Sequence, residues 1–223
     1  MKRAELSKYI AEAIGTFALV FCGTGAIVID NVRPGSIGNG GIAVTFGLIV
    51  MAMIFSFRHV SGAHINPAVS IAFWVNKQLD SRRLAGYLIA QFAGGIFASI
   101  VLRLLFVDHL TLGITQPQGA IYQTFFLEVI LTFMLMLVIF KVSSAHSSVA
   151  KFTAVAVGAV VLLEAYFAGP ITGASMNPSR SLAPALVSGN MEFLWIYLIA
   201  TPVDALLSIP VHRITQIQDS SHG

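Results

Sequence analysis

The chain has 223 residues, of which 56% are hydrophobic and only 10% are charged. An average soluble domain carries roughly 25% charged residues, so this composition excludes an ordinary water-soluble domain. The formal net charge is +3, but the basic residues lie in short connections between apolar stretches, which excludes a basic surface for nucleic acid.

Six apolar stretches are long enough to cross a lipid bilayer as helices. A hydrocarbon core of about 30 Å requires about 20 residues at a rise of 1.5 Å per residue. The predicted spans are 9–29, 41–57, 84–106, 121–140, 152–168 and 193–211. We therefore predict a multi-pass helical protein whose outer surface contacts membrane lipids.

The basic residues mark one side of this membrane protein. Ten of the 13 Lys and Arg residues precede the first span, separate the second from the third, flank the connection between the fourth and fifth, or follow the sixth. Because such residues are enriched on the cytoplasmic side, we expect both termini in the cytoplasm and the protein in the cell membrane. The three exceptions are Arg33, Arg103 and Arg180.

One motif occurs twice, 111 residues apart. The segment 61–70, SGAHINPAVS, is answered by the segment 172–181, TGASMNPSRS. Each copy contains three spans, and an odd number places the second copy in the opposite orientation. We predict a single membrane domain over 1–223 that consists of an inverted three-plus-three repeat, with copies at about 1–110 and 115–223.

A short apolar piece follows the Asn-Pro of each copy, at about 67–75 and 178–187. Both pieces are too short to span the bilayer. Asn is a strong helix N-cap and Pro is favoured at the first helical position, so each Asn-Pro predicts the start of a helix. The expected fold is an all-α membrane protein with six transmembrane helices and two re-entrant half-helices.

The two half-helices are expected to enter from opposite faces and to meet at their N-termini. Non-helical backbone at that depth is tolerated only where it is buried in protein or lines a water-filled cavity, which indicates a pore or a substrate pocket. Two positive helix ends and the amides of Asn66 and Asn177 then face one point. A neutral solute oxygen can accept hydrogen bonds there, whereas a cation is repelled.

The segments Asn66-Pro67-Ala68 and Asn177-Pro178-Ser179 resemble the paired Asn-Pro-Ala boxes of the aquaporin, or major intrinsic protein, family. The stretch 167–178 is similar to the nodulin-type branch, and the short loops favour a bacterial or archaeal member. The resemblance covers the whole chain. It implies a homotetramer with one pore per subunit, which passes water and small neutral solutes and excludes protons and ions. Ser179 departs from the usual Ala, and we expect the half-helix to tolerate this change.

The resemblance also implies a selectivity filter of four side chains, namely Phe46, Ala165, Ala174 and Arg180. Water-selective members place a His where this chain has Ala165. Two alanines predict a wider aperture that admits glycerol, urea or a metalloid hydroxide, such as arsenite, boric or silicic acid, beside water. Ser181 and Ala185 are instead typical of water channels, so the substrate range stays open.

Glu12 and Glu128 are ionisable groups inside spans, where each costs about 2.5 to 3.5 kcal/mol on insertion scales. The resemblance implies that they anchor the re-entrant loops through hydrogen bonds to the backbone. The alternative is a proton-coupled transporter that uses carboxyl groups as carriers, with Glu12, Glu128, Glu164 and Asp204 as candidates.

No cluster of His, Cys and carboxylate side chains has metal-ligand spacing, and no nucleophile stands beside a base in a motif. We therefore predict no metal, no cofactor and no enzymatic activity. His64 lies beside the first Asn-Pro box and is expected to line the cytoplasmic entrance.

Overall fold

The computed structural model describes residues 3–144 and 147–215, and the side chains of Ser147, Ser148 and Asp204 lie outside that description. The described chain is helical and contains no strand. Within the described residues, six helices are long and apolar enough to cross a membrane, which confirms the predicted fold class. They are α1 (Arg3–Val32), α2 (Gly38–Ser61), α4 (Ser81–Leu105), α5 (Ile121–Ser143), α7 (Thr153–Thr172) and α9 (Leu194–Ile214).

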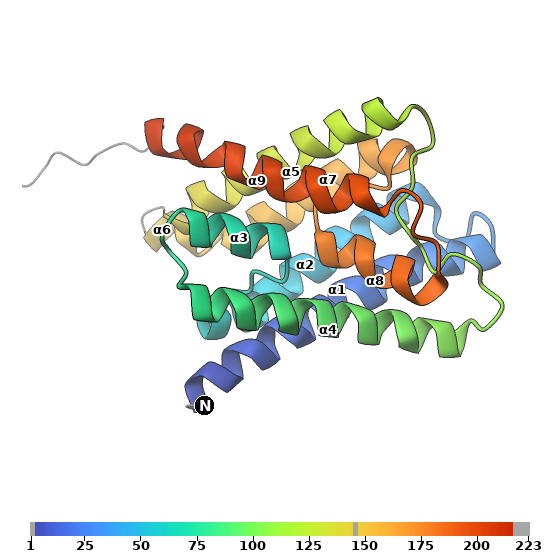
Figure 1. Ribbon diagram of the computed structural model, residues 1–223, viewed down its shortest axis with the longest axis horizontal. Helices are drawn as coiled ribbons and strands as arrows, with labels where there is room; N and C mark the ends of the chain where they lie inside the picture. The colour runs from blue at the N-terminus through green and yellow to red at the C-terminus, as the bar shows by residue number, and fades with distance from the viewer. Residues whose placement is uncertain (1–2, 145–146, 216–223) are drawn as a thin grey trace, which may run out of the picture.

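The two Asn-Pro segments form the short helices α3 (Pro67–Val75) and α8 (Pro178–Ser188), which begin at the predicted prolines. The side-chain oxygen of Asn66 accepts a hydrogen bond at 2.9 Å from the backbone N–H two residues later, and that of Asn177 does so at 3.0 Å. Both asparagines therefore cap their helices. Figure 1 shows α3 in one half of the molecule and α8 in the other.

The remaining helix, α6 (Ser147–Ala150), is a single turn in the connection between α5 and α7. Sequence reasoning missed it because four residues are too few to show a helical period. The predicted first span was too short, since α1 continues outward to Arg3. Its outer turn is polar, and Glu5 forms ion pairs with Lys8 at 3.0 Å and with Arg83 at 3.2 Å. A prediction from runs of apolar residues does not include such a turn.

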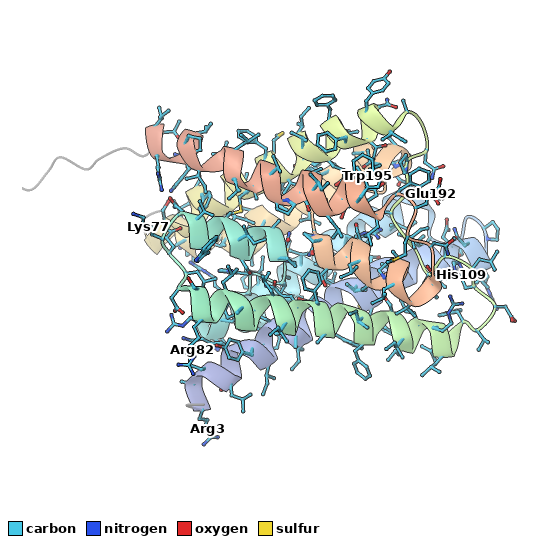
Figure 2. The ribbon with its side chains drawn as sticks, in the orientation of Figure 1. Arg3, Lys77, Arg82, His109, Glu192 and Trp195 are labelled. Atoms are coloured by element: carbon cyan, nitrogen blue, oxygen red, sulfur yellow. The ribbon has the colours of Figure 1, made fainter. Side chains whose placement is uncertain are left out.

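The two ends of the molecule differ in charge. Figure 2 shows Arg3, Lys77 and Arg82 at one end, and His109 and Glu192 at the other. The helix α1 begins and α9 ends at the end that carries the three basic residues (Figure 1). We call this the basic end and the other the opposite end. Basic residues that are far apart in the sequence therefore lie at the same end of the molecule.

The helices α2 and α7 cross at a pair of glycines. A Cβ atom on Gly47 would lie 2.6 Å from the carbonyl oxygen of Gly158, and one on Gly158 would lie 2.7 Å from that of Gly47. Only residues without a side chain allow the two backbones to approach so closely. The crossing sets α2, which carries Phe46, against α7, which carries Ala165.

Candidate functional site: two capped half-helices and a narrow junction

The segments that lead into α3 and α8 share an unusual backbone conformation. Ala63 and Ile65 have φ values of 51° and 44°, and Ala174 and Met176 have values of 41° and 52°. Left-handed backbone at residues other than glycine costs about 1 to 3 kcal/mol each and persists only where the surroundings impose it. The two loops therefore require strong partners, and two buried glutamates supply them.

Glu12 holds the first loop from α1. Its fully buried carboxylate accepts hydrogen bonds from the backbone N–H groups of His64 at 2.9 Å and Ile65 at 2.6 Å. The Ser61 hydroxyl donates to it at 2.7 Å and the Gln91 amide at 2.8 Å. Four donors satisfy this carboxylate, as expected of a loop anchor.

Glu128 holds the second loop from α5 in the same way. It is fully buried and accepts from the Thr172 hydroxyl at 2.7 Å, from the N–H of Ser175 at 2.9 Å and from the N–H of Met176 at 3.0 Å. These donors stand 111 residues after their counterparts on the first loop. The two loops therefore share one pattern of carboxylate anchoring.

One of the four donors to Glu12 has no counterpart at Glu128. Gln91 on α4 donates both to Glu12 and, at 2.9 Å, to the hydroxyl of Ser70. The segment 87–90, YLIA, recurs at 197–200, so the position that corresponds to Gln91 is Thr201 on α9. Its hydroxyl donates to the carbonyl of Tyr197 at 2.6 Å. The second loop is therefore anchored by one side-chain donor fewer.

The two half-helices are joined at their N-termini by reciprocal bonds. The Asn66 amide donates to the carbonyl of Met176 at 2.7 Å, and the Asn177 amide donates to the carbonyl of Ile65 at 3.0 Å. Both asparagines also line a cavity where the two loops meet, which we call the main cavity. Each amide has a second N–H, for which the described part of the chain offers no partner.

The main cavity has a volume of about 270 Å³. One side is a polar strip made by the two loops, and His64 is among its residues. The other side is apolar, with Leu19, Val50, Ile54, Leu135 and Val157 among its lining residues. A cavity with one polar lane and one apolar wall suits a small solute that keeps part of its hydrogen bonding during passage.

A second cavity of about 230 Å³ adjoins the first toward the opposite end. Phe46 and Arg180 line both cavities, whereas Ala174 lines only the first and Ala165 only the second. The Arg180 guanidinium lies over the Phe46 ring, 5.2 Å from its centroid. The structure therefore places Phe46 and Arg180 at the junction of the two cavities, with one of the two predicted filter alanines lining each cavity.

Arg180 is held at this junction by a distant loop. Its side chain is only 1% exposed, and its Nη1 atom donates to the carbonyl of Gly113 at 2.9 Å. The Nε and Nη2 atoms have no partner within the described residues. Arg180 lines both cavities, although these two nitrogen atoms are themselves buried.

Sequence reasoning missed the loop that carries Gly113, which connects α4 to α5. Leu112 of this loop is fully buried with a φ of 54°, and its N–H donates to Nδ1 of His109 at 3.0 Å. Burial first and the nearby Arg103 second lower the pKa of His109. The Leu112-Gly113 pair was a weak signal, because the same connection also contains Val107, Leu110 and Ile114.

Ser179, the departure from the usual box, makes a bond that Ala could not make. Its hydroxyl donates to the backbone carbonyl of Gln91 at 2.9 Å, which ties α8 to α4. The half-helix α8 is intact around this substitution.

Glu164 is 4% exposed and lines neither of the two cavities. Its carboxyl oxygens have no partner in the part of the chain that is described. Asp204 lies in α9, but its side chain is outside the described residues.

Comparison with known proteins agrees with this geometry. The family described as "Major intrinsic protein" matches residues 1–212. Nodulin-26 from Glycine max is 41% identical over 215 residues, which cover 96% of this chain and 79% of that protein. The putative aquaporin NIP4-1 from Arabidopsis thaliana is 43% identical over 213 residues, covering 95% and 75% of the two chains.

A solved structure, the aquaglyceroporin from Plasmodium falciparum, superimposes with a TM-score of 0.82 at 25% sequence identity. The match covers 95% of this chain and all of that one. With the family match over nearly the whole sequence, these similarities show that the chain belongs to the major intrinsic protein family.

Proposed function

We propose that the chain forms a passive membrane channel for water and small uncharged solutes such as glycerol, and that it excludes protons and ions. Its family, and relatives that are themselves named aquaporins, support this function. The observation that carries it is the pairing of Arg180 with Phe46 at the junction of two cavities.

Passage proceeds by exchange of hydrogen bonds along one lane. A solute oxygen accepts first from the guanidinium of Arg180 at the junction and then, deeper in the main cavity, from the second N–H of Asn177 and of Asn66. Backbone carbonyls of the two loops accept from the solute's hydroxyl groups. The lane offsets desolvation, while the apolar wall offers no site at which a solute is retained.

Charge excludes cations from the same lane. Arg180 carries a permanent positive charge at the junction. The N-termini of α3 and α8, each equivalent to about half a positive charge, meet near the middle of the molecule. A cation faces both barriers, whereas a neutral solute with an oxygen acceptor is favoured at each.

The predicted filter of Phe46, Ala165, Ala174 and Arg180 sets the size limit in this proposal. Only Phe46 supplies a large apolar side chain opposite Arg180, since the other two members are alanines. This combination favours a wide aperture that passes glycerol. A metalloid hydroxide is the alternative solute, because it is also small, neutral and rich in hydroxyl groups.

The proton-coupled alternative is disfavoured by the surroundings of the buried carboxylates. Glu12 and Glu128 each accept hydrogen bonds from loop N–H groups and hydroxyls and are committed to holding the loops. A carrier must release these partners whenever it takes up a proton, which would free the strained loops.

Membership of the family also supports the proposed assembly and location. We propose a homotetramer with one pore per subunit in the cell membrane, its basic end and both termini on the cytoplasmic side. Apolar side chains cover the outer faces of the spans, among them Ile89, Phe97 and Leu104, which are 71%, 60% and 71% exposed. Such surfaces suit lipid or neighbouring subunits. We further propose repeats at about 1–110 and 115–223.

Stopped-flow light scattering on proteoliposomes tests the proposed function. Vesicles are mixed with sucrose, an impermeant osmolyte, or with glycerol, and protein-free vesicles give the baseline. We expect fast shrinkage in sucrose, and fast re-swelling in glycerol. Boric acid serves as a further osmolyte to test metalloid passage.

Each result has a definite meaning. Shrinkage without re-swelling would make the protein a water channel with a tighter filter than two alanines predict. Flux that saturates and follows a pH gradient would favour the proton-coupled transporter. No acceleration over the protein-free vesicles would overturn the channel.

A further inference from the structure

The Phe46 ring rests on a position of α1 that has no side chain. A Cβ atom added to Gly23 would overlap three adjacent carbons of the ring, Cδ1, Cε1 and Cζ, far inside van der Waals contact. No flexible chain end is involved, because the obstacle is the aromatic ring itself. The ring therefore occupies space that exists only because residue 23 is glycine.

The opposite side of the ring faces the pore. Phe46 lines both cavities and lies beneath the Arg180 guanidinium at 5.2 Å, whereas Gly23 lines neither cavity. The helix α1 therefore stands behind the ring and the lumen lies in front of it. Any group that grew from position 23 would push the ring toward the lumen, since the backbone behind it is fixed by helix packing.

We propose that Gly23 is a specificity-determining residue of this channel, because its missing side chain lets Phe46 withdraw from the lumen and so sets the width of the aperture. This inference rests on the proposed function, in which Phe46 belongs to the filter. Gly23 acts through the ring and does not itself contact the solute, so it is a positioning residue.

The determinants of the filter then extend beyond the side chains that line it. With alanines at 165 and 174, the position of one aromatic ring governs how much room remains beside Arg180. An extra methyl group in a tight site changes discrimination by roughly tenfold or more. A methyl group at position 23 of α1 would change solute discrimination by moving the Phe46 ring, without altering any polar contact of the lane.

The experiment compares Gly23→Ala with a control on the same helix. At Gly25, two residues along α1, an added Cβ would meet only the Leu102 side chain at 3.4 Å, an ordinary contact. Both substitutions remove one buried helical glycine and add one methyl group. Phe46→Leu and the double variant Gly23→Ala with Phe46→Leu complete the set.

The measured quantity is the ratio of glycerol to water permeability in proteoliposomes, with thermal unfolding as a check on folding. We expect Gly23→Ala to lower the ratio by about tenfold and Gly25→Ala to leave it at the native value. We expect Phe46→Leu to raise it, and the double variant to match Phe46→Leu, because the methyl group acts only through the ring.

The outcomes separate this inference from the proposed function. An unchanged ratio in Phe46→Leu would overturn the filter assignment itself. The role of Gly23 alone would be overturned if Phe46→Leu raises the permeability ratio but the ratio of Gly23→Ala is equal to or higher than that of Gly25→Ala. Should Gly23→Ala not fold, the double variant decides: folding with the ratio of Phe46→Leu supports the inference, and any other result overturns it.

Discussion

The side-chain amide of Asn66 donates to the main-chain carbonyl of Met176 at 2.7 Å, across the boundary between the two half-helix segments. The reverse bond, from Asn177 to Ile65, spans 3.0 Å. Each asparagine thus caps its own helix through its oxygen and fastens the other loop through its nitrogen. The middle of the proposed pore is built from one residue type with two separate functions.

Substitutions at Asn66 separate these two functions. Asn66→Asp keeps the capping oxygen but replaces the donor to Met176 with a second oxygen, which repels the carbonyl. We expect α3 to persist and water permeability to fall strongly, as measured by stopped-flow light scattering. Asn66→Ala also removes the cap and should lower the free energy of unfolding by about 1 kcal/mol more. Native permeability in Asn66→Asp would contradict the proposed lane.

Ala165→His tests the predicted width of the filter. The imidazole would project into the cavity that Ala165 lines beside Phe46 and Arg180. We expect glycerol permeability to fall far more than water permeability, because added bulk excludes the larger solute first. Ala165→Ser is the matched control, since it adds polarity with little volume. Equal losses of both permeabilities in the His variant would mean that residue 165 does not face the narrow point.

Glu128→Gln tests whether the buried carboxylate is an anchor or a proton carrier. The amide nitrogen cannot accept a hydrogen bond, so at least one donor among Thr172, Ser175 and Met176 loses its partner. We expect the free energy of unfolding to fall by about 1 to 3 kcal/mol, measured by thermal unfolding in detergent. The exposed Glu192→Gln is the control and should leave stability unchanged. Loss of a pH-driven component of flux, with native stability, would favour the carrier instead.

His109 predicts a dependence of stability on pH. Its Nδ1 atom accepts from the N–H of Leu112, so the fold favours the neutral ring, and burial and Arg103 lower its pKa below the ordinary value of about 6.5. This contribution to stability is present above the ordinary pKa and is lost as the pH falls through the lowered pKa.

His109→Asn provides the comparison, since its side-chain oxygen accepts the same bond at every pH. We expect the thermal midpoint of the native protein to fall relative to that of the variant as the pH drops from 7 to about 5. Parallel curves for the two proteins would contradict a role of the neutral imidazole in holding the loop.

Local patterns in the sequence predicted most of the fold. Apolar runs gave the six spans, and the Asn-Pro pairs placed the first residues of α3 and α8 at Pro67 and Pro178. These features depend on neighbouring residues alone. The polar outer turn of α1 and the single turn α6 lacked such a signal and were missed or shortened.

Contacts between distant residues were harder to predict. The bond from Arg180 to Gly113 joins positions 67 residues apart, and the bond from Ser179 to Gln91 joins positions 88 apart. In neither pair does the local sequence around one residue predict its contact with the other. The contacts of Glu12 and Glu128 with the loops were expected only because the paired boxes resemble a known family. The position of Gly23 behind Phe46 required the structure.

Gln91 makes the two similar halves of the molecule differ in how each buried glutamate is bound. Its amide serves Glu12 in the first copy, while its backbone carbonyl receives Ser179 from the second. An assembly of two second copies would carry Thr201 at both equivalent positions, and neither glutamate would receive the amide bond. The two loops are therefore unequally anchored, and the bond from Ser179 to the backbone of Gln91 ties the segment with fewer side-chain donors to the other half of the molecule.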